Sequence, residues 1–189
     1  MTKLRIPVRD GVYLSGLVPT DKADLLEHLR TKDVYNTTLN IPHPYSAADA
    51  EGWIQKRIEH TRRIGHEVTF AIRRNDDRLI GIVSSENFQP GLTHKTEIGY
   101  WVAKPFWGQG VMTDAVRAFT KYAFSELDLV RLTAHVFASN LASARVLEKT
   151  GFKLEGFLRK HFQKDGELLD AKIYGLLKTD FDALQGDGS

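Results

Sequence analysis

The stretch PFWGQGVMTDAV, residues 105–116, is the part of the sequence that decides the fold. Gly108 and Gly110 lie one residue apart, and no charged side chain occurs in the stretch before Asp114. A helical pattern of apolar residues follows directly. The N–H groups at the start of a helix lack partners within the helix, and the helix dipole places a partial positive charge there. The stretch therefore predicts a helix N-terminus that binds an anion, a phosphate or diphosphate, through the main chain.

Two common phosphate-binding motifs do not fit this stretch. A P-loop requires a Lys-Ser or Lys-Thr pair after its second glycine, whereas Val111 and Met112 follow here. A dinucleotide-binding motif requires a third glycine within a βαβ unit, but Thr113 holds that position and no such unit surrounds it. The general mechanism of anion binding at a helix N-terminus remains. The alternative is a glycine-rich turn without a ligand, since glycine patterns this short are weak signals.

The segments on either side of the turn have clear periodicities. Residues 95–103, KTEIGYWVA, alternate as a strand, with Glu97, Gly99 and Trp101 on one face. Residues 131–137, RLTAHVF, form another strand. The segment NLASARVLEKTGF, residues 140–152, is typical of a short helix that ends at a glycine.

The rest of the chain predicts an α/β (α+β) fold. We expect, in order, a strand from Val12, a helix over 21–30, a loop over 36–46, a helix capped by Ser46 and Asp49, two strands joined by a turn at 74–77, and a last hairpin that turns at Asp165-Gly166. These elements give a mostly antiparallel mixed sheet of about seven strands with helices on both faces. We expect one domain over residues 1–184 and a flexible tail over 185–189.

The composition excludes several classes of protein. The 26 basic and 24 acidic residues give a net charge of +2 without a basic block, which argues against a nucleic-acid partner. No run of about 18 apolar residues is present, and the N-terminus lacks the apolar core of a secretory signal, so we expect a cytoplasmic protein that does not enter a membrane. The absence of cysteine excludes disulfides, zinc–thiolate sites and a cysteine nucleophile. The seven histidines show no metal-ligand spacing, and we expect no metal.

The order of these motifs resembles the GNAT superfamily of acetyl-CoA-dependent N-acetyltransferases. Within it, the chain is similar to the RimJ/RimL-like branch, which acetylates protein N-termini. The resemblance runs from Val12 to Lys178 and is densest from Thr96 to Gly156, through EIGYWV, the glycine turn and SNLASARVLEKTGF. It implies the GNAT acyl-CoA N-acyltransferase fold, acetyl-CoA as co-substrate, and the diphosphate of coenzyme A as the anion at the turn.

The resemblance also implies which residues hold the cofactor. The superfamily motif Gln/Arg-x-x-Gly-x-Gly/Ala falls here on Trp107, Gly108, Gln109, Gly110, Val111 and Met112. Trp107 and Met112 depart from it, although neither change removes a backbone amide. The superfamily also splays the strand before the turn from its neighbour, so that an amide near Tyr100, Trp101 or Val102 holds the thioester carbonyl. Asn140 is expected to cap its helix and to hydrogen-bond the pantetheine arm.

Acetyl transfer to an amine requires a base that removes a proton and an acid that protonates the departing thiolate. Glu97 is the candidate base, because it is a lone carboxylate in mid-strand just before the turn and burial there would suit it for proton removal. Its alternative is a solvated or ion-paired strand residue. Ser143 is the candidate acid and a further cofactor contact, because the position at which many relatives carry tyrosine is Leu147 here. The alternative for Ser143 is a residue that only completes the helix start.

The acceptor site is the least specified part of the sequence. The loop NIPHPY carries His43 and Tyr45, which with Phe88 are candidate acceptor contacts. A surface role is the alternative for His43, and a core role for Trp53, which has helical spacing. The arginine pairs at 62–63 and 73–74 are expected on solvated faces.

We therefore expect an enzyme that transfers an acetyl group to a primary amine by direct attack in a ternary complex. The leading acceptor is the N-terminal α-amine of a protein such as a ribosomal protein. Two alternatives stay open: a small amine such as an antibiotic, a polyamine or an amino acid, and a non-catalytic module that binds acyl-CoA. The sequence does not decide between a monomer and a homodimer.

Overall fold

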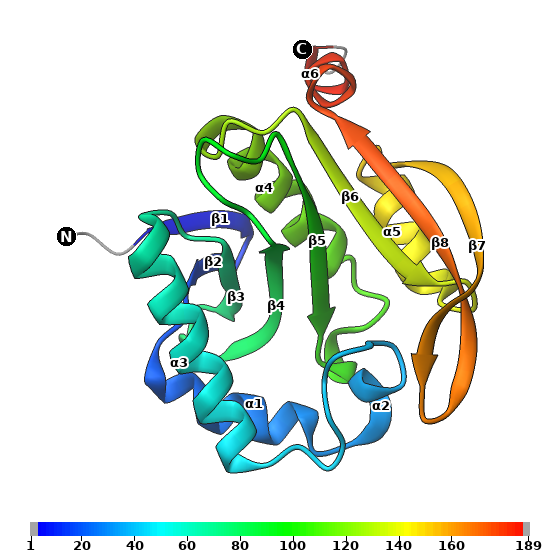
Figure 1. Ribbon diagram of the computed structural model, residues 1–189. Coiled ribbons are helices and arrows are strands. Elements are labelled where there is room, and N and C mark those ends of the chain that lie inside the picture. The colour runs from blue at the N-terminus through cyan, green and yellow to red at the C-terminus, as the bar shows by residue number, and fades with distance from the viewer. Residues whose placement is uncertain (1–3, 187–189) are drawn as a thin grey trace. The chain divides into compact units, whose positions relative to one another are not determined.

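The computed structural model describes residues 4–186, and Figure 1 shows the order of its elements. The strands are β1 (Arg5–Arg9), β2 (Val12–Gly16), β3 (Thr69–Arg74), β4 (Leu79–Glu86), β5 (Lys95–Val102), β6 (Arg131–Phe137), β7 (Lys153–Lys164) and β8 (Glu167–Leu177). The helices are α1 (Lys22–Leu29), α2 (Lys32–Tyr35), α3 (Ala47–Ile64), α4 (Val111–Glu126), α5 (Leu141–Lys149) and α6 (Lys178–Gly186), with short 3₁₀ turns η1 (Pro19–Asp21) and η2 (Lys104–Phe106). The expected mixed α/β fold with a mostly antiparallel sheet is confirmed.

The described chain divides into two compact units. The first unit contains residues 4–84 and 100–119, and the second contains residues 85–99 and 120–186. The chain passes from one to the other within β4, β5 and α4. Each unit therefore shares continuous elements with the other, and each is described by itself.

In the first unit, β1, β2, β3 and β4 pair in sequence order, and every pair is antiparallel. Strand β1 is an addition to the sequence prediction, which placed the first strand at Val12. Its sequence, RIPVR, alternates between exposed and half-buried residues and contains Pro7. Charged residues and proline are typical of an edge strand, and these same residues weaken the strand signal in the sequence.

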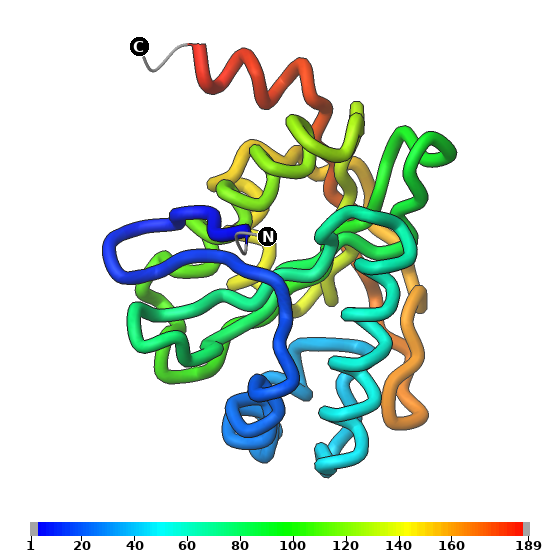
Figure 2. Tube along the Cα trace, turned by 90° about the vertical axis from the view of Figure 1, so that its left-hand side faces the viewer, coloured from blue at the N-terminus to red at the C-terminus, as the bar shows by residue number. Residues whose placement is uncertain are grey.

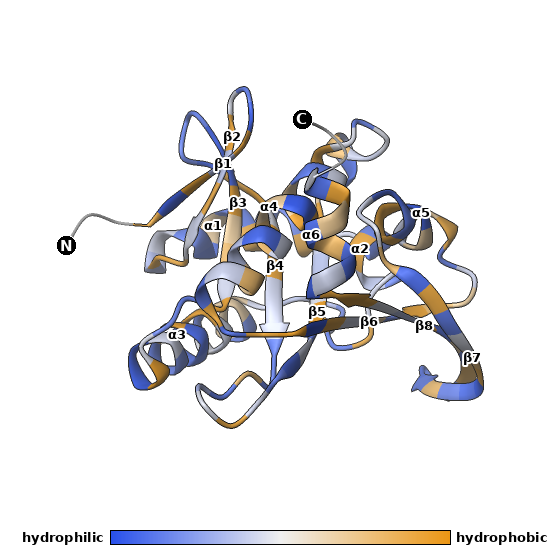
Figure 3. Ribbon diagram, turned by 90° about the horizontal axis from the view of Figure 1, so that it is seen from above, coloured by the Kyte–Doolittle hydropathy of each residue, from blue (hydrophilic) through white to orange (hydrophobic). Residues whose placement is uncertain are grey.

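Helices α1 and α3 cover one face of this sheet. A buried cluster joins α1, α2, α3, β3 and β4 through the residues Leu25, Leu29, Val34, Ala50, Ile54, Ala71, Leu79 and Ile82. Trp53 packs against this cluster, which confirms its expected place at the core. Figure 3 shows hydrophilic residues over most of the remaining surface of α3, as expected of an amphipathic helix with one buried stripe.

The first half of α4 covers the opposite face. Phe70 on β3 meets Phe119 edge to face, with ring centroids 5.9 Å apart. Its neighbour Ala71 belongs to the cluster under α1 and α3, because successive residues of a strand point to opposite faces. The sheet of this unit thus has helices on both faces, as the sequence predicts.

The start of α3 follows the expected capping pattern. The Ser46 hydroxyl accepts a hydrogen bond from the Asp49 N–H at 3.1 Å, and the Asp49 carboxylate accepts one from the Ser46 N–H at 2.8 Å. The helix ends at Gly65, which has a φ of +75°. Residues 36–46 before it contain neither helix nor strand, which confirms the predicted loop.

Arg73 corrects the expectation that the arginine pairs are solvated. Its side chain is only 6% exposed, and its two Nη atoms donate to the two carboxylate oxygens of Asp21 at 2.6 and 2.8 Å. Its Nε donates to the Ser15 hydroxyl at 2.8 Å. A buried guanidinium is tolerated because a bidentate carboxylate and further acceptors satisfy it. The pair joins β3 to η1, which no local pattern in the sequence indicates.

In the second unit, β5 pairs with β6 in parallel, β6 with β8 and β8 with β7 in antiparallel. The ladder between β5 and β6 consists of three residue pairs and ends at Glu97 with Thr133. The turn between β7 and β8 is formed as predicted by Asp165 and Gly166, with φ values of +52° and +82°. Residues 185 and 186 complete α6 instead of starting a flexible tail, and residues 187–189 lie outside the described part of the chain.

Candidate functional site

The glycine turn leads from η2 into α4. Gly108 and Gly110 have φ values of +73° and +79°, a region of backbone space that glycine enters without steric cost. The Asp114 N–H donates to the Gly110 carbonyl at 3.1 Å and begins the hydrogen bonding of α4. Left-handed residues in a turn can direct successive N–H groups toward one side, an arrangement that forms anion-binding concavities.

These N–H groups have no partner within the described structure. Among residues 4–186, no acceptor hydrogen-bonds the backbone N–H groups of residues 108–113. The first four N–H groups of any helix lack intrahelical partners, and here the preceding turn adds more. Gly108, Gln109 and Gly110 are exposed. The turn can therefore hold a doubly charged anion without a lysine.

Side chains on both sides of the motif hold the turn in shape. The Trp107 indole N–H donates to the Val102 carbonyl at 2.7 Å, which ties the turn to the end of β5. The Gln109 side-chain amide donates to the Pro105 carbonyl at 2.6 Å. Met112, where relatives carry a small residue, is buried. Of the two departures from the motif, Trp107 thus makes a hydrogen bond to β5 and Met112 is buried, and neither removes a backbone amide.

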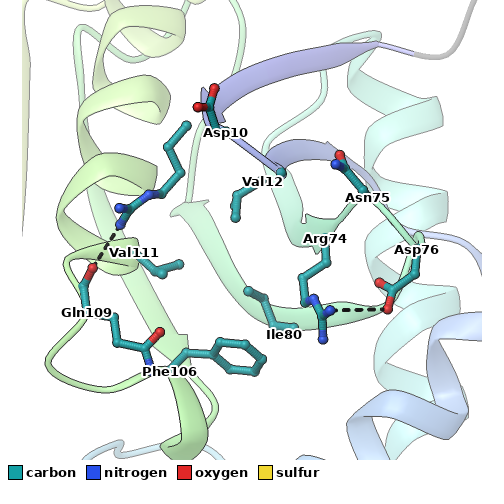
Figure 4. A pocket seen from close by; sticks show the side chains of 11 residues that line it. Asp10, Val12, Arg74, Asn75, Asp76, Ile80, Phe106, Gln109 and Val111 are labelled. Carbon is teal, nitrogen blue, oxygen red and sulfur yellow. Dashed lines mark hydrogen bonds and ion pairs between the residues drawn. The ribbon is translucent and has the colours of Figure 1, made fainter.

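Arg9 is a contributor to the turn that the sequence prediction missed. Its Nη1 donates to the Gln109 carbonyl at 2.8 Å across 100 residues of chain, and lies 3.5 Å from the Asp114 carboxylate. It lines a cavity of about 470 Å³, in which Gln109 and Val111 lie opposite Arg74 (Figure 4). Figure 2 shows the three loops that contribute to this cavity, from the β1–β2, β3–β4 and glycine turns, at one edge of the unit.

Removal of Arg9 is expected to weaken binding of coenzyme A at the turn. One hydrogen bond contributes about 0.5–1.5 kcal/mol net, so Arg9→Ala should weaken the affinity about twofold to tenfold. Isothermal titration with coenzyme A measures this change. Arg5→Ala is the matched control, because Arg5 lies on the same strand and stacks on Tyr13. Equal affinities for both variants would exclude Arg9 from the support of the turn.

The end of β5 lies close to β4, next to the turn. A Cβ atom on Gly81 would lie 2.5 Å from the Trp101 carbonyl oxygen, so only glycine permits this approach. Trp101 packs against the core cluster of the first unit, and Val102 is buried. Tyr100 is half-buried. The strand end that is expected to hold the thioester carbonyl is therefore firmly positioned.

Glu97 lies on β5 in the second unit, and its environment differs from the sequence expectation. Its side chain is 43% exposed, so the expected burial is wrong. One carboxylate oxygen, Oε1, lies 3.1 Å from Nδ1 of His135 on β6. The sequence prediction did not include His135, because the contact joins residues of two strands whose register the sequence does not show. The alternative prediction for Glu97 was a solvated glutamate or one paired with a lysine or an arginine. The contact found here is with a histidine.

Asn140 and Ser143 come together at the start of α5. The Asn140 side-chain oxygen accepts a hydrogen bond from the Ser143 backbone N–H at 3.1 Å, which confirms Asn140 as the helix cap. This bond uses the amide of Ser143 and leaves the role of its hydroxyl a prediction. Tyr174 is buried, and its hydroxyl donates to Glu148 at 3.1 Å. Burial, with the Glu148 contact second, raises the pKa of Tyr174, which agrees with a core role.

The candidate acceptor contacts fall into two groups. His43 and Tyr45 lie in the loop of the first unit, where the His43 ring packs on Tyr35 at 5.4 Å between centroids. Nδ1 of His43 is buried without a hydrogen-bond partner among the described residues. Burial, with the Asp49 carboxylate second, raises the pKa of Tyr45 to about 12. Phe88 lies in the second unit and is only 2% exposed, and its contact with an acceptor stays a prediction.

Metal sites and membrane-spanning helices are two further features to consider in the described residues. Residues 4–186 contain no group of three or more His, Asp or Glu side chains placed to hold a metal ion. None of the helices in the same range is long and apolar enough to span a bilayer.

Comparisons with known proteins identify the family and the fold of the chain. A family model described as an acetyltransferase (GNAT) domain matches residues 12–153. The chain is 41% identical over 133 residues to a probable N-acetyltransferase, YjcK, of Bacillus subtilis (strain 168), covering 69% of this chain and 74% of the relative. It is 30% identical over 132 residues to the ribosomal-protein-serine acetyltransferase of Escherichia coli (strain K12), covering 69% and 72%. The fold matches a ribosomal L7/L12 α-N-protein acetyltransferase, RimL, in complex with coenzyme A, with a TM-score of 0.82 at 21% identity over 92% and 98% of the two chains.

Proposed function

The chain belongs to the GNAT family of acetyltransferases, and from this premise we propose that it acetylates the N-terminal α-amine of a protein, such as a ribosomal protein. The family makes it an acetyl-CoA-dependent N-acetyltransferase. When bound, acetyl-CoA supplies the thioester from which the acetyl group is transferred. The acceptor is the part of the proposal that needs its own argument.

The observation that carries the cofactor part of the proposal is the row of unpartnered N–H groups over residues 108–113. A diphosphate is the part of coenzyme A that such a row fits, since it offers several anionic oxygens to amides at the positive end of a helix. Two hydrogen bonds support the turn: the Trp107 indole N–H donates to the Val102 carbonyl, and the Arg9 guanidinium donates to the Gln109 carbonyl. In this proposal the turn orients the cofactor, and residues of β5 and α5 carry the chemistry.

Glu97 acts as the base in this mechanism. An α-amine with a pKa near ~8 is mostly protonated at neutral pH and cannot attack until it loses a proton. The exposed carboxylate of Glu97 can accept that proton directly or through one water. Because the chain contains no cysteine, the amine attacks the thioester itself, without an acetylated cysteine. An amide of Tyr100, Trp101 or Val102 polarises the carbonyl. The pairing of β5 with β6 ends at Glu97, whereas β5 itself continues to Val102. This supports the role of the amides of residues 100–102 toward the carbonyl.

Ser143 acts as the acid toward the departing thiolate. Ser143→Ala should lower kcat by about tenfold, less than loss of a full general acid, because a thiol with a pKa near ~8.5 leaves without complete protonation. The fold should be intact, since the Asn140 cap binds the backbone amide of this residue. Steady-state kinetics with a circular dichroism spectrum measure both. An unchanged kcat would assign the proton to water.

The charges near the acceptor loop favour a protein N-terminus over a polycationic small amine. The three acidic residues between positions 31 and 51 all have partners: Asp33 pairs with Lys104 at 2.8 Å, Asp49 caps α3, and Glu51 pairs with Lys22 at 2.8 Å. The hydrogen bond from Lys104 lowers the pKa of Asp33. A loop whose acids are already neutralised offers little attraction to a polyamine or an aminoglycoside, whereas a single α-amine needs no such surface.

The test uses a panel of amines. The protein is incubated with acetyl-CoA and peptides that begin with alanine or serine, and the released thiol is followed by a colorimetric reagent. The same peptides with a blocked N-terminus are the control, and spermidine, an aminoglycoside and free amino acids form the comparison set. We expect thiol release with the free peptides and the acetyl group on their α-nitrogen by mass spectrometry.

The other outcomes separate the remaining functions. Release with the small amines alone would assign a small-molecule acetyltransferase. Binding of coenzyme A without release for any amine would assign a non-catalytic module. A mass-spectrometric comparison of acetylated proteins in cells with and without the gene then identifies the physiological acceptor.

A further inference from the structure

The close contact between Glu97 and His135, 3.1 Å from Oε1 to Nδ1, is part of a longer arrangement on one face of the second unit. The parallel register places Glu97 beside Thr133, and His135 follows two residues later on the same face of β6. His135 is 19% exposed on its side chain, less than half the exposure of Glu97. On β8 the residue opposite His135 is Ile173, which carries no charge. On β5, the Glu97 carboxylate is in contact with the imidazole.

A second histidine, His161, stacks on His135. The ring of His161 on β7 stacks on that of His135, with centroids 5.3 Å apart and planes within 10°. The same ring meets Phe162 edge to face at 4.8 Å. A ring that is stacked on one side and has a carboxylate at its edge has little rotational freedom, so Nδ1 of His135 stays directed at Glu97.

The stack depends on an irregularity in β7. The register of β7 against β8 shifts between Leu158 and Phe162, and Lys160 within this bulge has a φ of +51°, which is unfavourable for a residue with a side chain. The Lys160 N–H donates to the Asp170 carboxylate at 2.7 Å, which compensates this conformation. Bulges re-aim side chains and occur often beside active sites. Here the bulge directs His161 at His135.

A second charged pair in this unit joins Arg131 on β6 to Glu155 on β7. Arg131, four residues before His135 on β6, donates to the Glu155 carboxylate at 2.9 Å. It lies about 13 Å along the strand from His135, given a rise of about 3.3 Å per residue. Arg131 is thus engaged by Glu155, whereas His135 contacts Glu97.

We propose that His135 is a positioning residue for Glu97. Nδ1 of His135 lies 3.1 Å from Oε1 of Glu97, close enough for its N–H to donate to the carboxylate when the acceptor binds and to fix it, so that Oε2 is presented to the ammonium group of the acceptor. In the step that follows, an N–H bond of the ammonium breaks, an O–H bond forms at Oε2, and the electron pair stays on the amine nitrogen. This role rests on the proposed function of Glu97 as base. The stack with His161 and the β7 bulge, which the Lys160–Asp170 hydrogen bond stabilises, keep Nδ1 of His135 directed at Glu97.

Two substitutions of His135 test the proposal. His135→Leu removes the donor and should lower kcat about tenfold, the lower end of what loss of an orienting hydrogen bond costs, with the KM for acetyl-CoA unchanged. His135→Asn places a side-chain N–H near the position of Nδ1 and should restore most of the lost kcat. His161→Ala should lower kcat by a smaller factor. His94→Leu is the matched control, because His94 is an exposed histidine in the loop before β5, and its kcat should equal that of the wild type.

Each result is decisive when thermal melting and affinity for coenzyme A are measured beside the kinetics. A wild-type kcat in His135→Leu would overturn the proposal and leave the acetyltransferase function standing. An asparagine variant as slow as the leucine variant, with an unchanged melting temperature, would also overturn it, since a donor at Nδ1 would then be irrelevant. A wild-type kcat in His161→Ala would remove the stack from the account. Absence of acetyl transfer by the wild-type protein to any amine is the separate failure of the proposed function.

Discussion

Glutamine in place of Glu97 should lower kcat about a hundredfold at neutral pH, the lower part of the range for loss of a general base. An amide has nearly the shape of the carboxylate but accepts no proton, so the acceptor ammonium is left protonated. Coenzyme A affinity should stay the same, because the site proposed for the cofactor is the row of amides of residues 108–113, which does not include Glu97. Initial rates with a peptide acceptor and a titration with coenzyme A measure both.

The pH dependence of kcat in this variant tests whether Glu97 is the base. Above a pH of about 8 an α-amine increasingly loses its own proton, so the defect of Glu97→Gln should shrink as the pH rises through that value. Below it the defect should be largest. Glu167→Gln, at an exposed glutamate that starts β8, is the control and should follow the wild-type profile. A wild-type profile for Glu97→Gln would exclude Glu97 as the base.

Valine at position 110 should weaken binding of coenzyme A about tenfold or more. Gly110 has a φ of +79°, and a residue with a side chain in this region costs about 1–3 kcal/mol, which converts to about tenfold to a hundredfold if the turn relaxes to avoid it. The space itself is available, since the nearest atom to a Cβ at this position is Nη1 of Arg9 at 3.7 Å. The loss would therefore arise from backbone strain in the turn and from a side chain beside the diphosphate.

Gly166→Val is the matched control for this effect. Gly166, in the turn between β7 and β8, has a nearly equal φ of +82° and no atom within 4 Å of its Cβ position. The same substitution there should lower the melting temperature without a change in coenzyme A affinity. Calorimetry and thermal melting of both variants separate the two effects. Equal affinity of Gly110→Val and wild type would place the diphosphate elsewhere.

Much of the fold could be predicted from the sequence because its signals are local. Strand β6 has the predicted bounds, Arg131–Phe137, and α3 begins at the predicted Ser46 cap. The elements that were missed, β1, α2 and α6, are short or have mixed patterns. Strand β1 is an edge strand of five residues with charged residues and a proline, and it becomes a strand through its pairing with β2.

The candidate site divides in the same way. The glycine turn, the Asn140 cap and the place of Glu97 on its strand were predicted, and a motif or a spacing of a few residues suffices for each. The partners of these residues were not predicted: Arg9 for Gln109, His135 for Glu97, and Asp21 for Arg73. The burial expected for Glu97 was wrong, because exposure depends on what covers a strand and not on its own alternation.

The sequence by itself determined which backbone segments could bind an anion and which side chains could move a proton, because φ preferences, caps and alternation act over a few residues. Only the tertiary structure decided how those groups are held. The guanidinium of Arg9 reaches the turn across 100 residues, and a bulge in β7 aims His161 at the partner of Glu97. Strand register and bulges arise from the packing of distant segments, whose pairing free energy is shared among many residues, and no short stretch of sequence contains it.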